Sequence, residues 1–188
     1  MTWTRRRLLQ VGGALAGASA AGFALGGARG ADSGPNRDVD SRRIALVNLH
    51  TGEKLEIDYR RGGDYVPEAL SRIEAVLRDF RTGDQHPIDP KLMDYLCDVA
   101  QALGAEPTFH VISGYRSPQT NARLHAKSTG VAEHSLHMQG RAIDVRISGV
   151  DCARLAEHAL DLKFGGVGYY RASDFVHLDT GAFRAWKG

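Results

Sequence analysis

The sequence predicts an α+β domain built on a small, mainly antiparallel sheet with flanking helices. Three observations indicate this class: an alternating hairpin near the start of the domain, two amphipathic segments after it, and short apolar strands that alternate with helical segments in the second half. No internal repeat or low-complexity tract interrupts this pattern beyond the first thirty residues. We therefore expect a single domain.

The first elements are a hairpin and two helices. Residues 44–49 and 55–59 alternate apolar and polar side chains around Thr51-Gly52, which is typical of two strands joined by a turn. A helix is predicted over 67–80, because its apolar residues recur on one face. A second helix is predicted over 89–103, with an aspartate as its cap, a proline in its first position and a glycine at its exit.

The second half alternates strands with helices. Four short apolar segments are predicted as strands: 109–112, 142–147, 168–170 and 175–179. Two segments are predicted as helices: 118–127, which is capped by Ser117, and 151–163, which ends at Gly165. The last two strands are expected to pair antiparallel, since only a short turn separates them.

The first thirty residues are predicted to be an export signal. Arg5-Arg6-Arg7 begins a basic region, and residues 11–25 are apolar and rich in Ala and Gly. The pattern is typical of a twin-arginine signal, and an ordinary Sec signal is the alternative, because Leu8 and Gln10 replace the usual Phe and Lys. A permanent transmembrane helix is disfavoured, since a span needs roughly 20 apolar residues; retention as an uncleaved anchor stays open.

Residues 31–42 are polar and turn-forming, so they are expected to be a flexible linker, and the domain is expected to span 43–188. The chain has 24 basic and 22 acidic side chains. Four of the basic side chains and none of the acidic ones lie in the signal, residues 1–30, so the remainder has a small negative net charge. This balance does not support nucleic-acid binding. A membrane contact is expected only through the signal.

Cys97 and Cys152 are the two cysteines of the sequence. In an exported protein they can form a disulfide, and a pair of buried free thiols is the alternative. The sequence does not give the Cα separation that decides between them.

One motif carries most of the chemical information. Its pattern is Ser135-x-His137-x-x-Gly140-x-Ala142-x-Asp144, and His177 follows on a separate apolar strand. Two imidazoles and a carboxylate are a ligand set that catalytic zinc takes, with water in the fourth position. Gly140 lets the backbone turn, and an aspartate inside an apolar strand is costly unless it is paired or bound to metal. The sequence therefore predicts one zinc held by His137, Asp144 and His177.

A purely structural interpretation of these residues is also open. Asp144 can form an ion pair with Arg146 or Arg116 while His137 lies at the surface, and a lone buried histidine such as His177 is most often a hydrogen-bonded core residue.

The motif resembles the clan of zinc peptidases that includes D-Ala-D-Ala metallopeptidases, lysostaphin-like enzymes and hedgehog domains, and within it the YcbK-like family of murein endopeptidases. The resemblance covers about residues 43–186 and includes four further segments: 48–53, 112–117, 165–170 and 175–181. It implies a hedgehog-like or D-Ala-D-Ala-peptidase-like fold, one Zn²⁺ per chain, and hydrolysis of peptide cross-links in peptidoglycan, those between two diaminopimelate residues among them.

Two carboxylates compete for the role of general base, which must take a proton from the attacking water. Asp174 lies three residues before His177, as the acid does in several relatives of the clan, and is the predicted base. Asp179 shares a strand face with His177 and is the alternative, either as the base or as a group that orients a ligand. Asp174 can also be a residue that only forms the turn.

Arg116 is the predicted substrate contact, because the matching arginine of relatives is thought to bind a substrate carboxylate or carbonyl oxygen, and a planar guanidinium suits that task. A structural ion pair with an acid near the metal is the alternative. Ser113, Tyr115 and His134 are expected to line the same region. The Gly165-Gly166-Val167-Gly168 run lacks the features of a phosphate loop, so it is interpreted as a backbone bend that lets a peptide approach.

The sequence thus predicts an exported, periplasmic, zinc-dependent endopeptidase whose partners are the peptide stems of peptidoglycan. A carboxypeptidase that trims stem ends is one alternative, and a non-catalytic zinc-containing peptidoglycan-binding module is the other. A carboxylate within reach of the attacking water would separate the enzymes from the binding module.

Overall fold

A computed structural model describes residues 40–104, 108–128 and 130–188 of the chain. Its strands are β1 (Arg42–Asn48), β2 (Lys54–Arg61), β3 (Asp64–Tyr65), β4 (Thr108–Ser113), β5 (Ala142–Ile147), β6 (Gly166–Tyr170), β7 (Phe175–Asp179) and β8 (Arg184–Lys187). Its helices are α1 (Pro67–Val76), α2 (Pro90–Ala102), α3 (Pro118–His125), the 3₁₀ helix η1 (Leu136–Gln139) and α4 (Cys152–Asp161). The expected signal, and the expected linker up to residue 39, lie outside the described residues.

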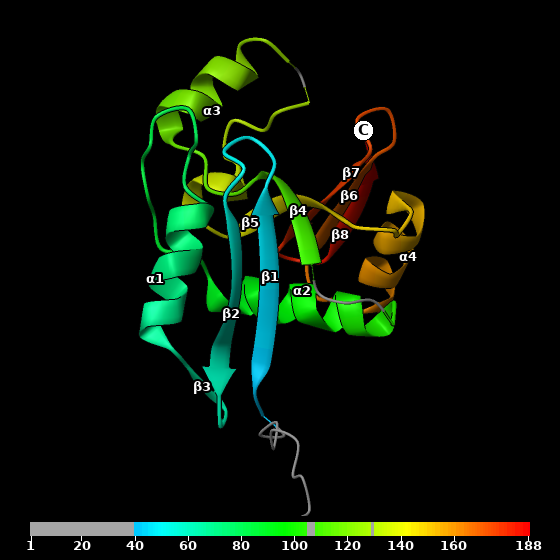
Figure 1. Cartoon of the computed structure of the whole chain (residues 1–188). Coiled ribbons are helices and arrows are strands. Elements are labelled where there is room, and N and C mark those ends of the chain that lie inside the picture. The colour runs from blue at the N-terminus through cyan, green and yellow to red at the C-terminus, as the bar shows by residue number, and fades with distance from the viewer. Residues whose placement is uncertain (1–39, 105–107, 129) are drawn as a thin grey trace, which may run out of the picture. The chain divides into compact units, whose positions relative to one another are not determined.

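The eight strands form one sheet in the order β3-β2-β1-β4-β5-β7-β6-β8 (Figure 1). Five of the seven neighbouring pairs are antiparallel, whereas β1 with β4 and β6 with β8 are parallel. The expected α+β class and the mainly antiparallel sheet are confirmed. The hairpin of β1 and β2 and the antiparallel pair of β6 and β7 are confirmed as well.

Helices α1, α2 and α4 contribute to a single hydrophobic core with one face of the sheet. Figure 1 shows α2 crossing behind β1 and α4 beside the strands of the second half. Strand β5 separates this core from the opposite face, because its side chains alternate. Ile143 and Val145 join the core, whereas Asp144 points to the other face of the sheet.

Helix α1 ends earlier than its apolar pattern predicts, at Val76 instead of residue 80. In a continued helix the amide of Arg81 would bond to the carbonyl of Leu77. That carbonyl instead accepts a hydrogen bond of 2.7 Å from the amide of Tyr115, and the Arg81 amide donates to the carboxylate of Asp79. The chain has already left the helix before this point, because the amide of Asp79 bonds to the carbonyl of Asp84 and the side chain of Asn48 donates to the carbonyl of Val76. These contacts replace the bonds of a longer helix.

Three short elements are absent from the sequence-based expectation: β3, η1 and β8. The first two are a two-residue strand and a four-residue turn of 3₁₀ helix, and β8 is four residues long. Such lengths give too few residues for a hydrophobic period. None of the helices in the described residues is long and apolar enough to span a membrane.

The two cysteines are free thiols in the structure. Cys97 donates a hydrogen bond to the carbonyl of Arg43, and Cys152 is buried at the start of α4. Of the two alternatives, the structure therefore has the free thiols.

Candidate metal centre

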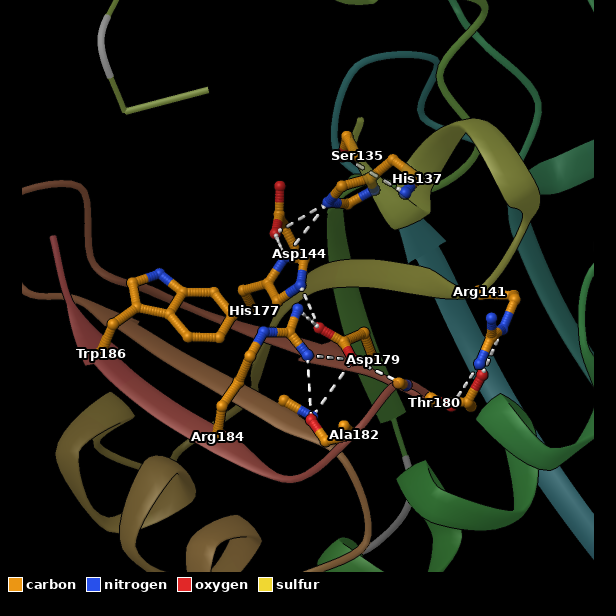
Figure 2. A network of polar contacts seen from close by, with 12 residues as sticks. Ser135, His137, Arg141, Asp144, His177, Asp179, Thr180, Ala182, Arg184 and Trp186 are labelled. Atoms are coloured by element: carbon orange, nitrogen blue, oxygen red, sulfur yellow. Dashed lines mark hydrogen bonds and ion pairs between the residues drawn. The ribbon is translucent and has the colours of Figure 1, made fainter. Parts of the chain in front are cut away.

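The structure brings His137, Asp144 and His177 together, although they come from three elements (Figure 2). Asp144 of β5 and His177 of β7 are direct partners in the register of an antiparallel pair, and so their side chains share one face. His137 lies on η1, just before β5. The hydroxyl of Ser135 accepts a hydrogen bond of 3.3 Å from the His137 amide and caps η1, which accounts for the serine of the motif.

Gly140 ends η1 and turns the chain into β5. Its φ of 64° lies in the left-handed region, and a side chain there would overlap the carbonyl of Pro87. Only glycine satisfies both conditions, so the predicted role of Gly140 as a backbone turn is confirmed.

The three inner atoms form a small triangle. His137 Nε2 lies 3.2 Å from His177 Nδ1 and 3.3 Å from Asp144 Oδ1, and His177 Nδ1 lies 2.9 Å from Asp144 Oδ1. Ligands about 2.0–2.1 Å from a tetrahedral zinc are about 3.3 Å apart. The residues present therefore fit a zinc ion after shifts of a few tenths of an ångström. Within the described residues, no other group of three His, Cys, Asp or Glu side chains meets the same geometric condition.

The outer nitrogens of both imidazoles bond to oxygen acceptors. His137 Nδ1 lies 2.7 Å from the carbonyl oxygen of Gly114, and His177 Nε2 lies 3.0 Å from Asp179 Oδ2. A carbonyl or an ionised carboxylate can only accept, so each outer nitrogen donates. In the neutral imidazole the inner nitrogen then keeps a lone pair, as a metal ligand requires.

Burial and mutual contact shift the pKa values of all three groups. Burial raises the pKa of Asp144, but the two imidazoles outweigh it and hold that pKa well below its usual range. Burial lowers the pKa of His137. For His177, hydrogen bonds to Asp144 and Asp179 outweigh burial and raise the pKa. The carboxylate is thus ionised across the physiological range, as a metal ligand must be.

Arg116 lies beside the cluster with an incompletely bonded guanidinium. It is buried, yet its contacts are long: 3.4 Å to Asn121, 3.4 Å to Ser113 and 3.7 Å to Asp144 Oδ2. Its Nε has no hydrogen-bond partner. A buried guanidinium is costly when its donors are unused. Burial lowers the pKa of Arg116.

Asp79 holds the loop that carries Arg116, and the sequence analysis did not identify it. Its buried carboxylate accepts hydrogen bonds from the amide and the hydroxyl of Ser117, at 2.9 and 2.7 Å, and from the amide of Arg81. Burial raises the pKa of Asp79, but these bonds prevail and lower it to about 2. No short sequence motif predicts this role, because Ser117 lies 38 positions away in the sequence.

The two candidate bases have different surroundings. The carboxylate of Asp174 is 65% exposed, lies 3.2 Å from Arg146 Nη1, and is not part of the cavity lining. Asp179 is fully buried and accepts from His177 Nε2, on the side of the imidazole away from the other two cluster residues. The structure therefore brings neither carboxylate next to the inner atoms of the cluster, and Asp174 as the base stays a prediction.

A cavity of about 330 Å³ opens onto the cluster. Its walls include five further polar or aromatic residues: Arg116, His134, Tyr170, Arg184 and Trp186. His134 is there as expected, whereas Ser113 contacts Arg116 and Tyr115 stacks on His86.

Tyr170, Arg184 and Trp186 are wall residues that the sequence did not predict, and the last two come from the same strand. That strand is β8, and the alternation in Arg184-Ala185-Trp186 was the available signal. The indole of Trp186 lies over Gly168, where a Cβ would come within 2.5 Å of the ring. The glycine run therefore makes room for this side chain, and the interpretation that it lets a peptide approach has no support from this contact.

Comparison with known proteins assigns the chain to a family. The family described as peptidoglycan L,D-endopeptidase MepK matches residues 36–186. Peptidoglycan L,D-endopeptidase MepK of Escherichia coli (strain K12) is 42% identical over 145 residues, which are 77% of this chain and 80% of the relative. The Shigella flexneri protein of that name gives the same values. A probable MepK of Haemophilus influenzae is 40% identical over 148 residues, 78% of this chain and 80% of the relative.

The family match, residues 36–186, includes the cluster and the residues that line the cavity. The expected likeness to the YcbK-like endopeptidases and the expected peptidase activity are confirmed. The chain belongs to the MepK family of peptidoglycan endopeptidases.

Proposed function

We propose that the protein is a zinc-dependent endopeptidase that cleaves peptide cross-links of peptidoglycan outside the cytoplasm. The observation that carries the proposal is the convergence of His137 Nε2, Asp144 Oδ1 and His177 Nδ1, each within 3.3 Å of the others, on the wall of a cavity. A zinc ion held by these three residues would polarise the scissile carbonyl and make the attacking water more acidic.

Arg116 is the proposed substrate contact. Its guanidinium lines the cavity, lies 3.7 Å from Asp144 Oδ2, and makes only long hydrogen bonds. A substrate carboxylate or carbonyl oxygen would complete these bonds and would be held beside the reacting carbonyl. The ion pair with Asp144 is too long to offset, by itself, the cost of burying this guanidinium.

The proposed bond joins an L-centre carbonyl to a D-centre amine. The relatives from Escherichia coli and Haemophilus influenzae are named as L,D-endopeptidases. In a cross-link between two diaminopimelate residues, the carbon next to the scissile nitrogen carries a free carboxylate. A buried arginine beside the cluster is the group that such a substrate requires.

Asp174 is the proposed proton acceptor, on the ground of its position three residues before His177. It lies in a turn, with a φ of 51°, and its side chain is 65% exposed. To act as the base, the carboxylate must leave Arg146 and rotate toward the cavity. A loop residue with an exposed side chain can make that change without disturbing the core.

The location is proposed from the signal in residues 1–30, with Arg5-Arg6 as its twin arginines. Replacement of both by lysine should leave the precursor in the cytoplasm. Normal export of that variant would indicate an ordinary Sec signal instead.

The decisive experiment uses purified mature protein and intact murein sacculi, with and without chelator, and identifies the released fragments by mass. We expect fragments from cleaved cross-links, their loss with chelator, and their return with added zinc. His177→Ala is the matched inactive variant. Release of single terminal residues would indicate a carboxypeptidase, and binding without any release would indicate a non-catalytic module.

A further inference from the structure

Asp179 is the buried centre of a second polar network behind the metal cluster (Figure 2). It is fully buried, and its two oxygens accept from five donors. The donors are His177 Nε2 at 3.0 Å, the amides of Gly166 at 3.1 Å and Gly181 at 2.8 Å, and both terminal nitrogens of Arg184. A buried carboxylate that is bonded in this way has a fixed orientation.

The pair between Arg184 and Asp179 is bidentate. Nη1 lies 3.1 Å from Oδ1 and Nη2 lies 2.7 Å from Oδ2, so the guanidinium fork sets the plane of the carboxylate. Oδ2 is also the oxygen that accepts from His177 Nε2. The orientation of Arg184 is therefore passed directly to one imidazole of the cluster.

One glycine and one tryptophan hold Arg184 in place. A Cβ at Gly166 would overlap both Asp179 and Arg184 Nη1, so the absence of a side chain there admits the pair. The guanidinium carbon lies 5.0 Å from the ring centroid of Trp186, within the range of a cation–π contact. The Trp186 indole in turn lies 5.2 Å from the imidazole of His177 and donates to the Tyr170 hydroxyl.

Arg184 differs from Arg116, although both line the cavity. The terminal nitrogens of Arg184 are already bonded, to Asp179 and to the carbonyl of Ala182. Those of Arg116 have only contacts of 3.4 Å or longer. A guanidinium with satisfied donors serves to position a neighbour, whereas one with free donors serves to bind a ligand.

We propose that Arg184 is a positioning residue for the metal centre: acting through Asp179, it holds the ring of His177 with the proton on Nε2 and Nδ1 directed at His137 and Asp144. The inference rests on the proposed zinc site and adds to it a residue that does not touch the metal. Partners that orient ligand histidines typically change metal affinity by 10- to about 100-fold when they are removed.

The test measures the zinc dissociation constant of the purified protein by competition with a chelating indicator at constant pH. Arg184→Gln should weaken zinc binding at least about 10-fold, and Arg184→Lys should recover part of the loss, because lysine keeps the charge but not the fork. Lys187→Gln is the matched control: it removes an exposed charge from the same strand and should bind zinc like the unchanged protein.

A double-mutant cycle tests the route through Asp179. Arg184→Gln combined with Asp179→Asn should bind zinc no more weakly than Asp179→Asn alone, because both changes act on His177 in series. In ¹⁵N-histidine-labelled, zinc-loaded protein, the nitrogen shifts should give a metal-bound Nδ1 and a protonated Nε2 for His177. The thermal melting temperature of every variant shows whether it is folded. If Asp179→Asn does not fold, the zinc dissociation constants of Arg184→Gln, Arg184→Lys and the unchanged protein still test the proposal.

Zinc affinity of Arg184→Gln within about twofold of the unchanged protein would overturn the proposal, since oriented ligands predict a larger loss. A rise in KM without a change in zinc affinity would overturn it too, and would make Arg184 a substrate contact. Fully additive losses in the double variant would exclude Asp179 as the route. Failure of the unchanged protein to bind one zinc would instead contradict the proposed function itself.

Discussion

Two polar clusters of this protein are each built around a carboxylate, and they differ in what the surrounding groups can offer. Asp94 of α2 accepts from the hydroxyls of Tyr59 at 2.9 Å and Tyr65 at 2.6 Å, and pairs with Arg42 at 3.5 Å and Arg60 at 3.7 Å. All four partners are donors: each tyrosine hydroxyl donates a hydrogen bond to one oxygen of the carboxylate, and the two arginines add positive charge nearby. Burial and the Asp94 carboxylate raise the pKa of Tyr65 to about 12, which keeps it a donor.

Asp144 has the opposite surroundings. Its closest neighbours are the inner nitrogens of His137 and His177, at 3.3 and 2.9 Å, and in neutral imidazoles both carry lone pairs. Arg116 lies 3.7 Å away with long bonds of its own. The Asp94 cluster holds α2 against the first strands and needs no ligand, whereas the inner atoms of the Asp144 cluster are all acceptors when both imidazoles are neutral, and a proton or a metal ion then completes them. A carboxylate surrounded by donors, such as Asp94, thus serves the fold, whereas one that faces other potential acceptors, such as Asp144, can serve a metal site.

The largest expected effect is on zinc content, and it should appear only when the Asp144 cluster is changed. His177→Ala should lose most bound zinc and all hydrolysis, because two ligands do not hold zinc tightly. Asp94→Asn should retain one zinc and lower only the thermal stability. Elemental analysis of the folded proteins, together with fragment release from sacculi, measures both outcomes. Stoichiometric zinc in the His177→Ala protein would contradict the ligand assignment.

Loss of the general base should lower kcat without changing the zinc content. If Asp174 rotates into the cavity as proposed, Asp174→Asn lowers kcat by about 10²-fold and keeps zinc. Asp179→Asn should instead weaken zinc binding, because it disturbs the orientation of His177. An unchanged kcat in Asp174→Asn would show that Asp174 serves only its pair with Arg146, and Arg146→Gln is the control that removes this pair.

A change at Arg116 tests whether its unused donors bind substrate. Arg116→Lys keeps the charge but loses the planar fork, so kcat/KM should fall by roughly 10-fold or more while zinc is retained. Steady-state kinetics on a purified cross-linked peptide dimer measure the effect. A loss of zinc in place of a loss of kcat/KM would make Arg116 a structural partner of Asp144.

The smallest effect concerns a satisfied carboxylate, Asp79, and it depends on pH. Its pKa of about 2 lies below that of an unfolded aspartate, so ionised Asp79 stabilises the fold above about pH 4, and this contribution is lost as the pH falls toward 2. Asp79→Asn should therefore cost about 2 kcal/mol at neutral pH and progressively less in acid. Denaturant unfolding of the metal-free proteins at several pH values checks this. A difference that does not change with pH would indicate lost packing instead.

The regular parts of the fold could be predicted because local patterns determine them. Strand β5 was predicted with its observed bounds from alternation, and Asp89 and Ser117 were recognised as helix caps. The end of α1 could not be predicted, because Asn48 and Tyr115, both distant in the sequence, donate to the carbonyls of Val76 and Leu77 that a longer helix would use.

The candidate site divides in the same way. The motif with its ordered residue types pointed to His137, Asp144 and His177, and the structure brings them together. The roles of Arg184 and Asp79 could not be predicted, because they consist of contacts to Asp179 and Ser117 that form only in the folded chain. The position of Asp174 three residues before His177 did not reveal its pairing with Arg146, which depends on strand register.

The alternation of β5 has a consequence for how the protein tolerates mutation. Ile143 and Val145 belong to the core, whereas Asp144 between them belongs to the cluster. Substitutions at odd and even positions of this strand should therefore have different effects when cellular abundance and activity are measured separately. Polar replacements at Ile143 and Val145 should lower the abundance of the protein, whereas replacements of Asp144 should leave an abundant but inactive protein. Neighbouring positions of one strand are therefore under different selective pressures.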